Sequence, residues 1–136
     1  MRKRTFPGRL DKLADISLFV VQAAEEAGLD DSGVYAIELA VDEAATNIIE
    51  HAYQGEDRGE ICCSIEVNRD GLKVILQDWG NPFDPKKVPE PTLGASLEKI
   101  QSSGLGLFFI RKLMDEVQFE FSKEKGNTIT LVKRRK

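Results

Sequence analysis

Apolar residues recur at helical spacing in two stretches of the N-terminal half. In residues 11–27 they fall at three- and four-residue steps, and Gly28 follows where a helix would end. The next stretch follows three residues suited to helix capping, 30–32, and runs without glycine or proline from 34 to about 53. The pattern therefore predicts two consecutive amphipathic helices.

The hydrophobic period changes to two after these helices. Residues 61–67 and 72–76 alternate between apolar and more polar positions, which predicts a β-hairpin with an Asp-Gly turn at 70–71. The same alternation returns in residues 117–122 and 127–132. We therefore expect a second hairpin at the C-terminal end.

The stretch between the two hairpins has a different character. Residues 80–104 include several prolines, which exclude a core helix or a central strand, and a loop of this length is usually functional or mobile. Helical spacing resumes in residues 105–114. The order of elements predicts an α+β fold: a two-layer α/β sandwich with helices on one face of a mainly antiparallel sheet.

Composition narrows the class of protein. A chain of 136 residues with 41% hydrophobic content suits one domain over residues 1–136. A formal net charge of −4 disfavours general binding to nucleic acid, and the longest apolar run, 18–21, is too short to cross a membrane. Adjacent strand residues point to opposite faces, so Cys62 and Cys63 are a poor disulfide pair. We expect a soluble cytoplasmic protein without nucleic-acid or membrane partners.

One row of the second helix combines small and polar residues. At 100° per residue, Ala36, Ala40, Glu43 and Asn47 share a row beside the apolar stripe. The alanines indicate close approach of another element, and the polar pair would be partly buried unless a polar cavity opens there. The alternative is a glutamate at the solvent edge and an asparagine that makes a local hydrogen bond.

Two further features carry polar or glycine residues at unusual places. Asp78 falls on the core face of its strand and Gly80 follows, although an aspartate that caps the next turn would give the same pattern. Gly104, Leu105 and Gly106 open the third helix, where bare backbone amides can hold an anion. Together with the polar helical row, these features predict a nucleotide site.

These motifs carry a resemblance to a known family. Residues 38–53 resemble the Glu-x-x-x-Asn box of the ATPase superfamily that includes gyrase and sensor histidine kinases. Residues 78–85 and 104–115 look like its two glycine boxes, in the version found in bacterial anti-sigma factor serine/threonine kinases. The resemblance extends over about residues 5–132 and implies the histidine-kinase-like ATPase fold, with ATP and Mg²⁺ bound.

The resemblance implies roles for single residues. Glu43 is the catalytic general base, and Asn47 binds the nucleotide as the protein ligand of Mg²⁺. Asp78 accepts a hydrogen bond from the adenine amino group, and residues 81–103 form a lid. The other implied nucleotide-binding residues are Gly80, Gly104, Leu105 and Gly106.

The sequence departs from the family pattern at two places. Asn81 and Pro82 stand where the superfamily often has a second glycine, which suits the anti-sigma branch. Asn127 follows Gly126 where many relatives have threonine, and an asparagine can supply the polar group.

The function implied by the resemblance is that of an ATP-binding anti-sigma factor. Such a protein sequesters a sigma factor and phosphorylates a serine or threonine of an anti-sigma antagonist, and relatives suggest a homodimer. The alternative is a nucleotide-gated protein-binding regulator without phosphotransfer. Glu43 favours the kinase, because a pure binding module has no need of a carboxylate at that position.

Overall fold

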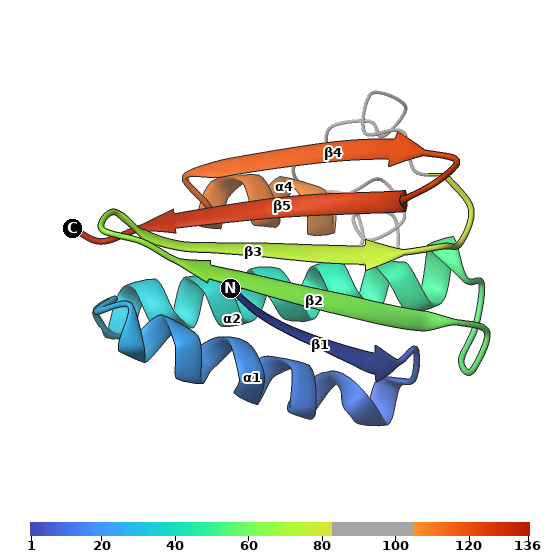
Figure 1. Ribbon diagram of the computed structural model, residues 1–136, viewed down its shortest axis with the longest axis horizontal. Coiled ribbons are helices and arrows are strands. Elements are labelled where there is room, and N and C mark those ends of the chain that lie inside the picture. The colour runs from blue at the N-terminus through green and yellow to red at the C-terminus, as the bar shows by residue number, and fades with distance from the viewer. Residues whose placement is uncertain (83–104) are drawn as a thin grey trace.

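The computed structural model describes residues 1–82 and 105–136, whose elements form two layers (Figure 1). In this part of the chain, five strands form one antiparallel sheet in the order β1-β2-β3-β5-β4, and the helices cover one of its faces. The strands are β1 (Arg2–Pro7), β2 (Glu60–Val67), β3 (Gly71–Asp78), β4 (Glu116–Ser122) and β5 (Gly126–Arg134). The helical elements are η1 (Leu10–Lys12), α1 (Leu13–Glu26), α2 (Asp31–Asn47), η2 (Ile48–Ala52) and α4 (Leu105–Leu113). The expected α+β sandwich is confirmed.

The predicted caps define where α1 ends and α2 begins. Gly28 has a φ of +80°, and its N–H bonds to the carbonyl of Glu25 while the N–H of Leu29 bonds to that of Ala24. This pair of hydrogen bonds closes the end of α1 and reverses the chain. Asp30 then accepts a hydrogen bond from the Gly33 N–H at 2.7 Å, which caps the first turn of α2.

Two details of the sheet differ from the sequence prediction. The chain begins with β1, which was not predicted because only Phe6 of its six residues is buried and apolar alternation is absent. In the first hairpin, mutual backbone bonds between Asn68 and Gly71 make Arg69 and Asp70 the central turn residues. The turn therefore lies one residue earlier than the expected Asp-Gly pair.

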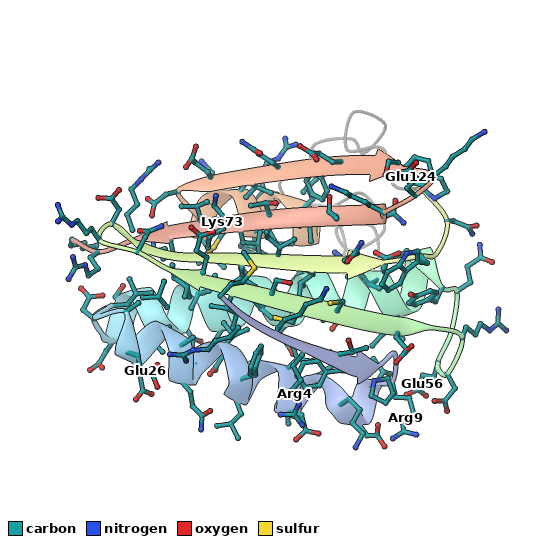
Figure 2. All side chains as sticks on the ribbon, in the orientation of Figure 1. Arg4, Arg9, Glu26, Glu56, Lys73 and Glu124 are labelled. Atoms are coloured by element: carbon teal, nitrogen blue, oxygen red, sulfur yellow. The ribbon has the colours of Figure 1, made fainter. Side chains whose placement is uncertain are left out.

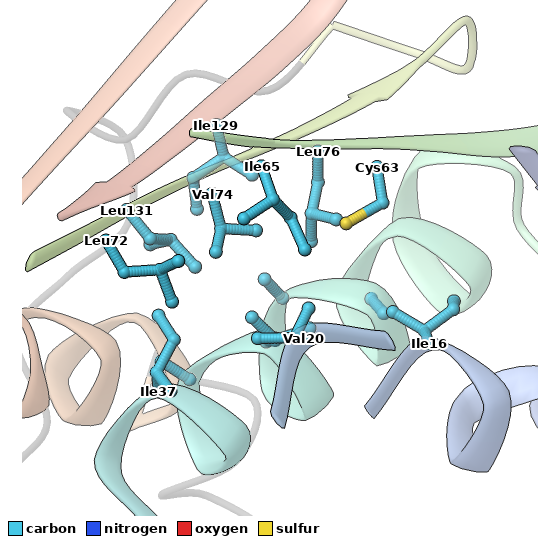
Figure 3. Packing of buried hydrophobic residues seen from close by; sticks show 14 of the residues in the cluster. Ile16, Val20, Ile37, Cys63, Ile65, Leu72, Val74, Leu76, Ile129 and Leu131 are labelled. Atoms are coloured by element: carbon cyan, nitrogen blue, oxygen red, sulfur yellow. The ribbon is translucent and has the colours of Figure 1, made fainter. Parts of the chain in front are cut away.

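The core lies between the sheet and the helices. Figure 3 shows side chains of the sheet, such as Val74 and Leu131, facing Val20 of α1 and Ile37 of α2. All four of these side chains are fully buried. Burying a side chain of this size contributes roughly 1.5 to 3 kcal/mol, so this layer fixes the position of α2 against the sheet.

The opposite face of the sheet carries polar and charged side chains, among them Lys73 (Figure 2). Within the described ranges, none of the helices combines the length and the apolar content needed to cross a membrane. Of the expected lid, only Asn81 and Pro82 are described, and residues 83–104, including Gly104, lie outside the described part.

Candidate functional site

The polar row on α2 has the predicted gradient of burial. Ala36 and Ala40 are buried, whereas Glu43 and Asn47 are half-buried, one helical turn apart. The alanines allow close packing, and the row then reaches a zone where polar side chains retain some contact with solvent. Glu43 is thus neither fully buried nor fully exposed, and it retains access to solvent beside the packed part of the row.

The environment of Glu43 favours its protonated form relative to an exposed glutamate. Burial is the main cause that raises the pKa of Glu43, and the nearby charges of Asp42 and Glu50 raise it further. The charge of His51 acts in the opposite direction. A carboxylate with a raised pKa is a better proton acceptor when it is ionised, which is the property of a general base.

The first turn of α4 lies directly against Glu43. A Cβ atom added to Gly106 would overlap Glu43 Oε1 and lie 2.8 Å from its Cδ. Only glycine at position 106 leaves the carboxylate in this place. Leu105 begins α4, so the predicted glycine motif and the predicted base meet where α2 and α4 pack together.

The wide helical turn η2 follows α2 and contacts the backbone that comes after β3. In η2 the N–H of Tyr53 bonds to the carbonyl of Ile48, five residues earlier, which is the π-helical pattern. The carbonyl of Ala52, the last residue of η2, accepts a hydrogen bond from the Asn81 N–H at 2.8 Å. The backbone of Gly80 lies so close to this carbonyl that a Cβ atom would overlap it. This contact places the end of α2 beside the end of β3 (Figure 1).

Asp78 is a buried carboxylate at the end of β3. Its side chain is 3% exposed, and its Oδ1 accepts hydrogen bonds from the Gly80 N–H and from Asn127 Nδ2, both at 2.9 Å. Burial raises the pKa of Asp78, and these two hydrogen bonds lower it in part. Since both bonds end on Oδ1, Oδ2 is the oxygen that the described residues leave for a ligand.

Asn127 holds the turn that follows β3. It pairs with Asp78 in the register of β3 and β5, and its Nδ2 also reaches the carbonyls of Asn81 at 3.0 Å and Gly80 at 3.3 Å. The sequence indicated a polar group here but not its partner, because the pairing depends on strand register. The sequence also did not indicate a role for Tyr53. Its hydroxyl accepts a hydrogen bond from the Trp79 N–H at 3.0 Å.

The structure brings most of the predicted residues into two contact groups. Glu43 and Gly106 form one group, at the start of α4. Asp78 and Gly80 form the other, which η2 links to the end of α2 at Asn47. The arrangement combines a half-buried carboxylate, the first turn of a helix and a buried acceptor.

Comparison with known proteins identifies the family of the chain. Residues 6–133 match the model of the histidine kinase-like ATPase domain. The chain is 33% identical over 114 residues to a serine-protein kinase RsbW of Listeria monocytogenes, and the aligned region covers 81% of this chain and 71% of the relative. It is 31% identical over 131 residues to a serine-protein kinase RsbW of Bacillus cereus, covering 93% of this chain and 80% of the relative.

Solved structures share the fold at lower sequence identity. The RsbU and RsbW domains of a Mycobacterium tuberculosis protein match with a TM-score of 0.63 and 16% identity, over 98% of this chain and 32% of that one. The nucleotide-free catalytic domain of the histidine kinase ThkA matches with a TM-score of 0.56 and 17% identity, over 100% of both chains. The fold expected from the resemblance is thus confirmed.

Proposed function

The chain belongs to the histidine kinase-like ATPase domain family, in the branch of the RsbW serine-protein kinases, and from this premise we propose its substrates and partners. It is an anti-sigma factor that sequesters a sigma factor. It uses ATP to phosphorylate a serine or threonine of an anti-sigma antagonist in the cytoplasm, and it acts as a homodimer.

Glu43 is the observation that carries the proposal. Its half-buried carboxylate lies against the first turn of α4, and its surroundings raise its pKa. The attacking hydroxyl oxygen forms a bond to the γ-phosphorus while the bond to the bridging oxygen breaks and ADP leaves. Glu43 accepts the hydroxyl proton, and the α4 amides face the charge that develops on the phosphoryl oxygens.

Asp78 and Gly80 form the proposed adenine side of the site. Asp78 Oδ2 accepts a hydrogen bond from the adenine amino group, because Oδ1 is engaged by Gly80 and Asn127. The base lies beside the backbone of Gly80, whose missing side chain lets this turn pack against the Ala52 carbonyl. The buried carboxylate selects an adenine, which has a donor at this position, over a guanine, which has an acceptor there.

A magnesium ion fits the donor set when ATP supplies part of its shell. The described residues contain no group of three or more His, Cys, Asp or Glu side chains that could hold a metal. Mg²⁺ accepts one or two protein oxygens together with phosphate oxygens and water. Asn47 would supply its amide oxygen, and the bound ion would neutralise phosphate charge during transfer.

The test is transfer of labelled phosphate from ATP. The chain is incubated with Mg²⁺, γ-labelled ATP and each candidate antagonist encoded in the same genome. We expect label on a serine or threonine of one antagonist, together with release of that antagonist from the chain. Tight binding of ATP and partner without transfer at any magnesium concentration would leave the nucleotide-gated regulator as the function.

A further inference from the structure

Tyr53 is a buried tyrosine whose hydroxyl joins two backbone segments. Its side chain is 8% exposed, and its hydroxyl donates to the Glu60 carbonyl at 2.6 Å while it accepts from the Trp79 N–H at 3.0 Å. The ring packs against Gly59, where a Cβ atom would overlap it. The ring alone could fill this space, so the hydroxyl has a separate role in holding Trp79.

The Trp79 N–H belongs to the peptide unit that follows Asp78. At the other end of this unit, the Asp78 carbonyl lies so close to Gly126 that a Cβ atom there would overlap it. Gly126 has a φ of +70°, which glycine adopts without strain. The peptide unit is therefore held by Tyr53 at its nitrogen and confined by Gly126 at its oxygen.

The orientation of this peptide unit affects the carboxylate of Asp78. The next N–H, of Gly80, donates to Asp78 Oδ1, so a rotation around Trp79 would move this donor. Oδ1 would then be held by Asn127 alone among the described donors. When fewer hydrogen bonds hold Oδ1, the carboxylate rotates more freely. The position of Oδ2 relative to a ligand then varies more.

We propose that Tyr53 is a positioning residue for base recognition, because its hydroxyl fixes the Asp78–Gly80 turn and thereby aims Asp78 Oδ2 at the adenine amino group. The inference rests on the proposed adenine contact of Asp78. It assigns Tyr53 an effect on the discrimination between bases, whereas a residue that only fills the core would weaken the binding of all nucleotides equally.

The test compares two nucleotides that differ only at the amino group. Dissociation constants are measured for ATP and for purine riboside triphosphate, which lacks that group, with wild type, Tyr53→Phe and Tyr35→Phe. Tyr35 is 61% exposed, so the same chemical change there is a matched control. We expect wild type and Tyr35→Phe to bind ATP more tightly than purine riboside triphosphate. In Tyr53→Phe this ratio of dissociation constants should fall by about tenfold.

A second variant covers the case in which Tyr53→Phe does not fold. Gly126→Ala pushes on the oxygen end of the same peptide unit and should reduce the same preference. An unchanged ratio of the two constants in Tyr53→Phe, or in Gly126→Ala where Tyr53→Phe does not fold, would overturn the inference. A wild type that binds both nucleotides equally would instead overturn the proposed contact of Asp78, and the inference with it.

Discussion

Among the described residues, Asp78 is a buried carboxylate and Glu43 a half-buried one, and their hydrogen-bond surroundings differ. Asp78 is fixed through Oδ1 by two donors, which suits a hydrogen-bond acceptor that must stay ionised. Glu43 has an environment that raises its pKa and no side-chain hydrogen bond among the described residues, which leaves it able to take up a proton. These environments support the proposed roles of Asp78 in recognition and of Glu43 in proton transfer.

Replacement of Asp78 by asparagine should weaken ATP binding. An amide can turn its donor towards the adenine amino group, and a buried mispaired contact of this kind costs about 1 to 3 kcal/mol, or roughly tenfold to a hundredfold in affinity. Calorimetry measures the loss directly. An ATP affinity equal to that of wild type would remove Asp78 from the site.

The pH dependence of ATP binding gives the same contact a second signature. Burial raises the pKa of Asp78, so the acceptor is fully available above this raised pKa and is lost as the pH falls through it. Wild-type affinity should therefore decline on the acidic side, and Asp78→Asn should lack that decline.

Replacement of Asn47 by alanine should reduce the effect of magnesium. The variant loses the amide oxygen proposed to bind the ion, so the gain in ATP affinity on adding Mg²⁺ should shrink, and phosphate transfer should fall with it. Affinity measured with Mg²⁺ and with a chelator gives this gain. A gain as large as in wild type would argue against Asn47 as the metal ligand.

At the scale of elements, the site depends on how α2, α4 and β3 meet. The π-helical turn η2 directs the Ala52 carbonyl to Asn81, so the end of α2 and the end of β3 have a fixed spacing. Gly106 allows α4 to approach the Glu43 side chain. These two contacts fix the two parts of the proposed nucleotide site along the same helix.

Replacement of Gly106 by alanine should impair transfer without loss of stability. Alanine favours helix over glycine by about 1 kcal/mol, so the free energy of unfolding should stay equal or increase. The added Cβ would displace the Glu43 carboxylate, and transfer should fall by at least about tenfold. Thermal unfolding and single-turnover rates separate the two effects, and wild-type transfer by this variant would contradict the role of Gly106.

Sequence patterns were sufficient for the elements that have one buried face. The apolar stripes of α1 and α2 and the alternation in β2 and β3 follow directly from burial, and the buried position of Asp78 follows from its phase in β3. Strand β1 has only one buried side chain and therefore no such pattern. Its place in the sheet depends on pairing with β2.

The supporting contacts of the site could not be predicted for a different reason. Asn127 lies opposite Asp78 because β3 and β5 pair in this register, although the two residues are 49 positions apart in the sequence. The Tyr53 hydroxyl bonds to the Trp79 N–H from the end of η2, a π-helical turn that the apolar pattern of the sequence does not indicate. Tertiary packing, which a single sequence does not display, determines both contacts.

At the scale of the whole molecule, the proposed site and a cluster of arginines lie apart. The predicted site joins the C-terminal ends of α2 and β3 with the first turn of α4. A hollow lined in part by Arg69, Arg134 and Arg135 lies instead at the turn between β2 and β3 and after the end of β5. In Figure 1 this turn lies at the opposite end of the sheet from the end of β3. The basic cluster is thus separate from the residues proposed to bind ATP.

Single-turnover phosphate transfer by wild type and Glu43→Gln tests the central claim most directly. Glutamine keeps the size and polarity of Glu43 but cannot accept a proton. Transfer to the cognate antagonist should therefore fall by about a hundredfold or more, while the affinities for ATP and for both partners stay within about twofold of wild type. Equal transfer rates for the two proteins would contradict the assignment of Glu43 as the base. Tight binding without transfer by wild type would contradict the kinase itself.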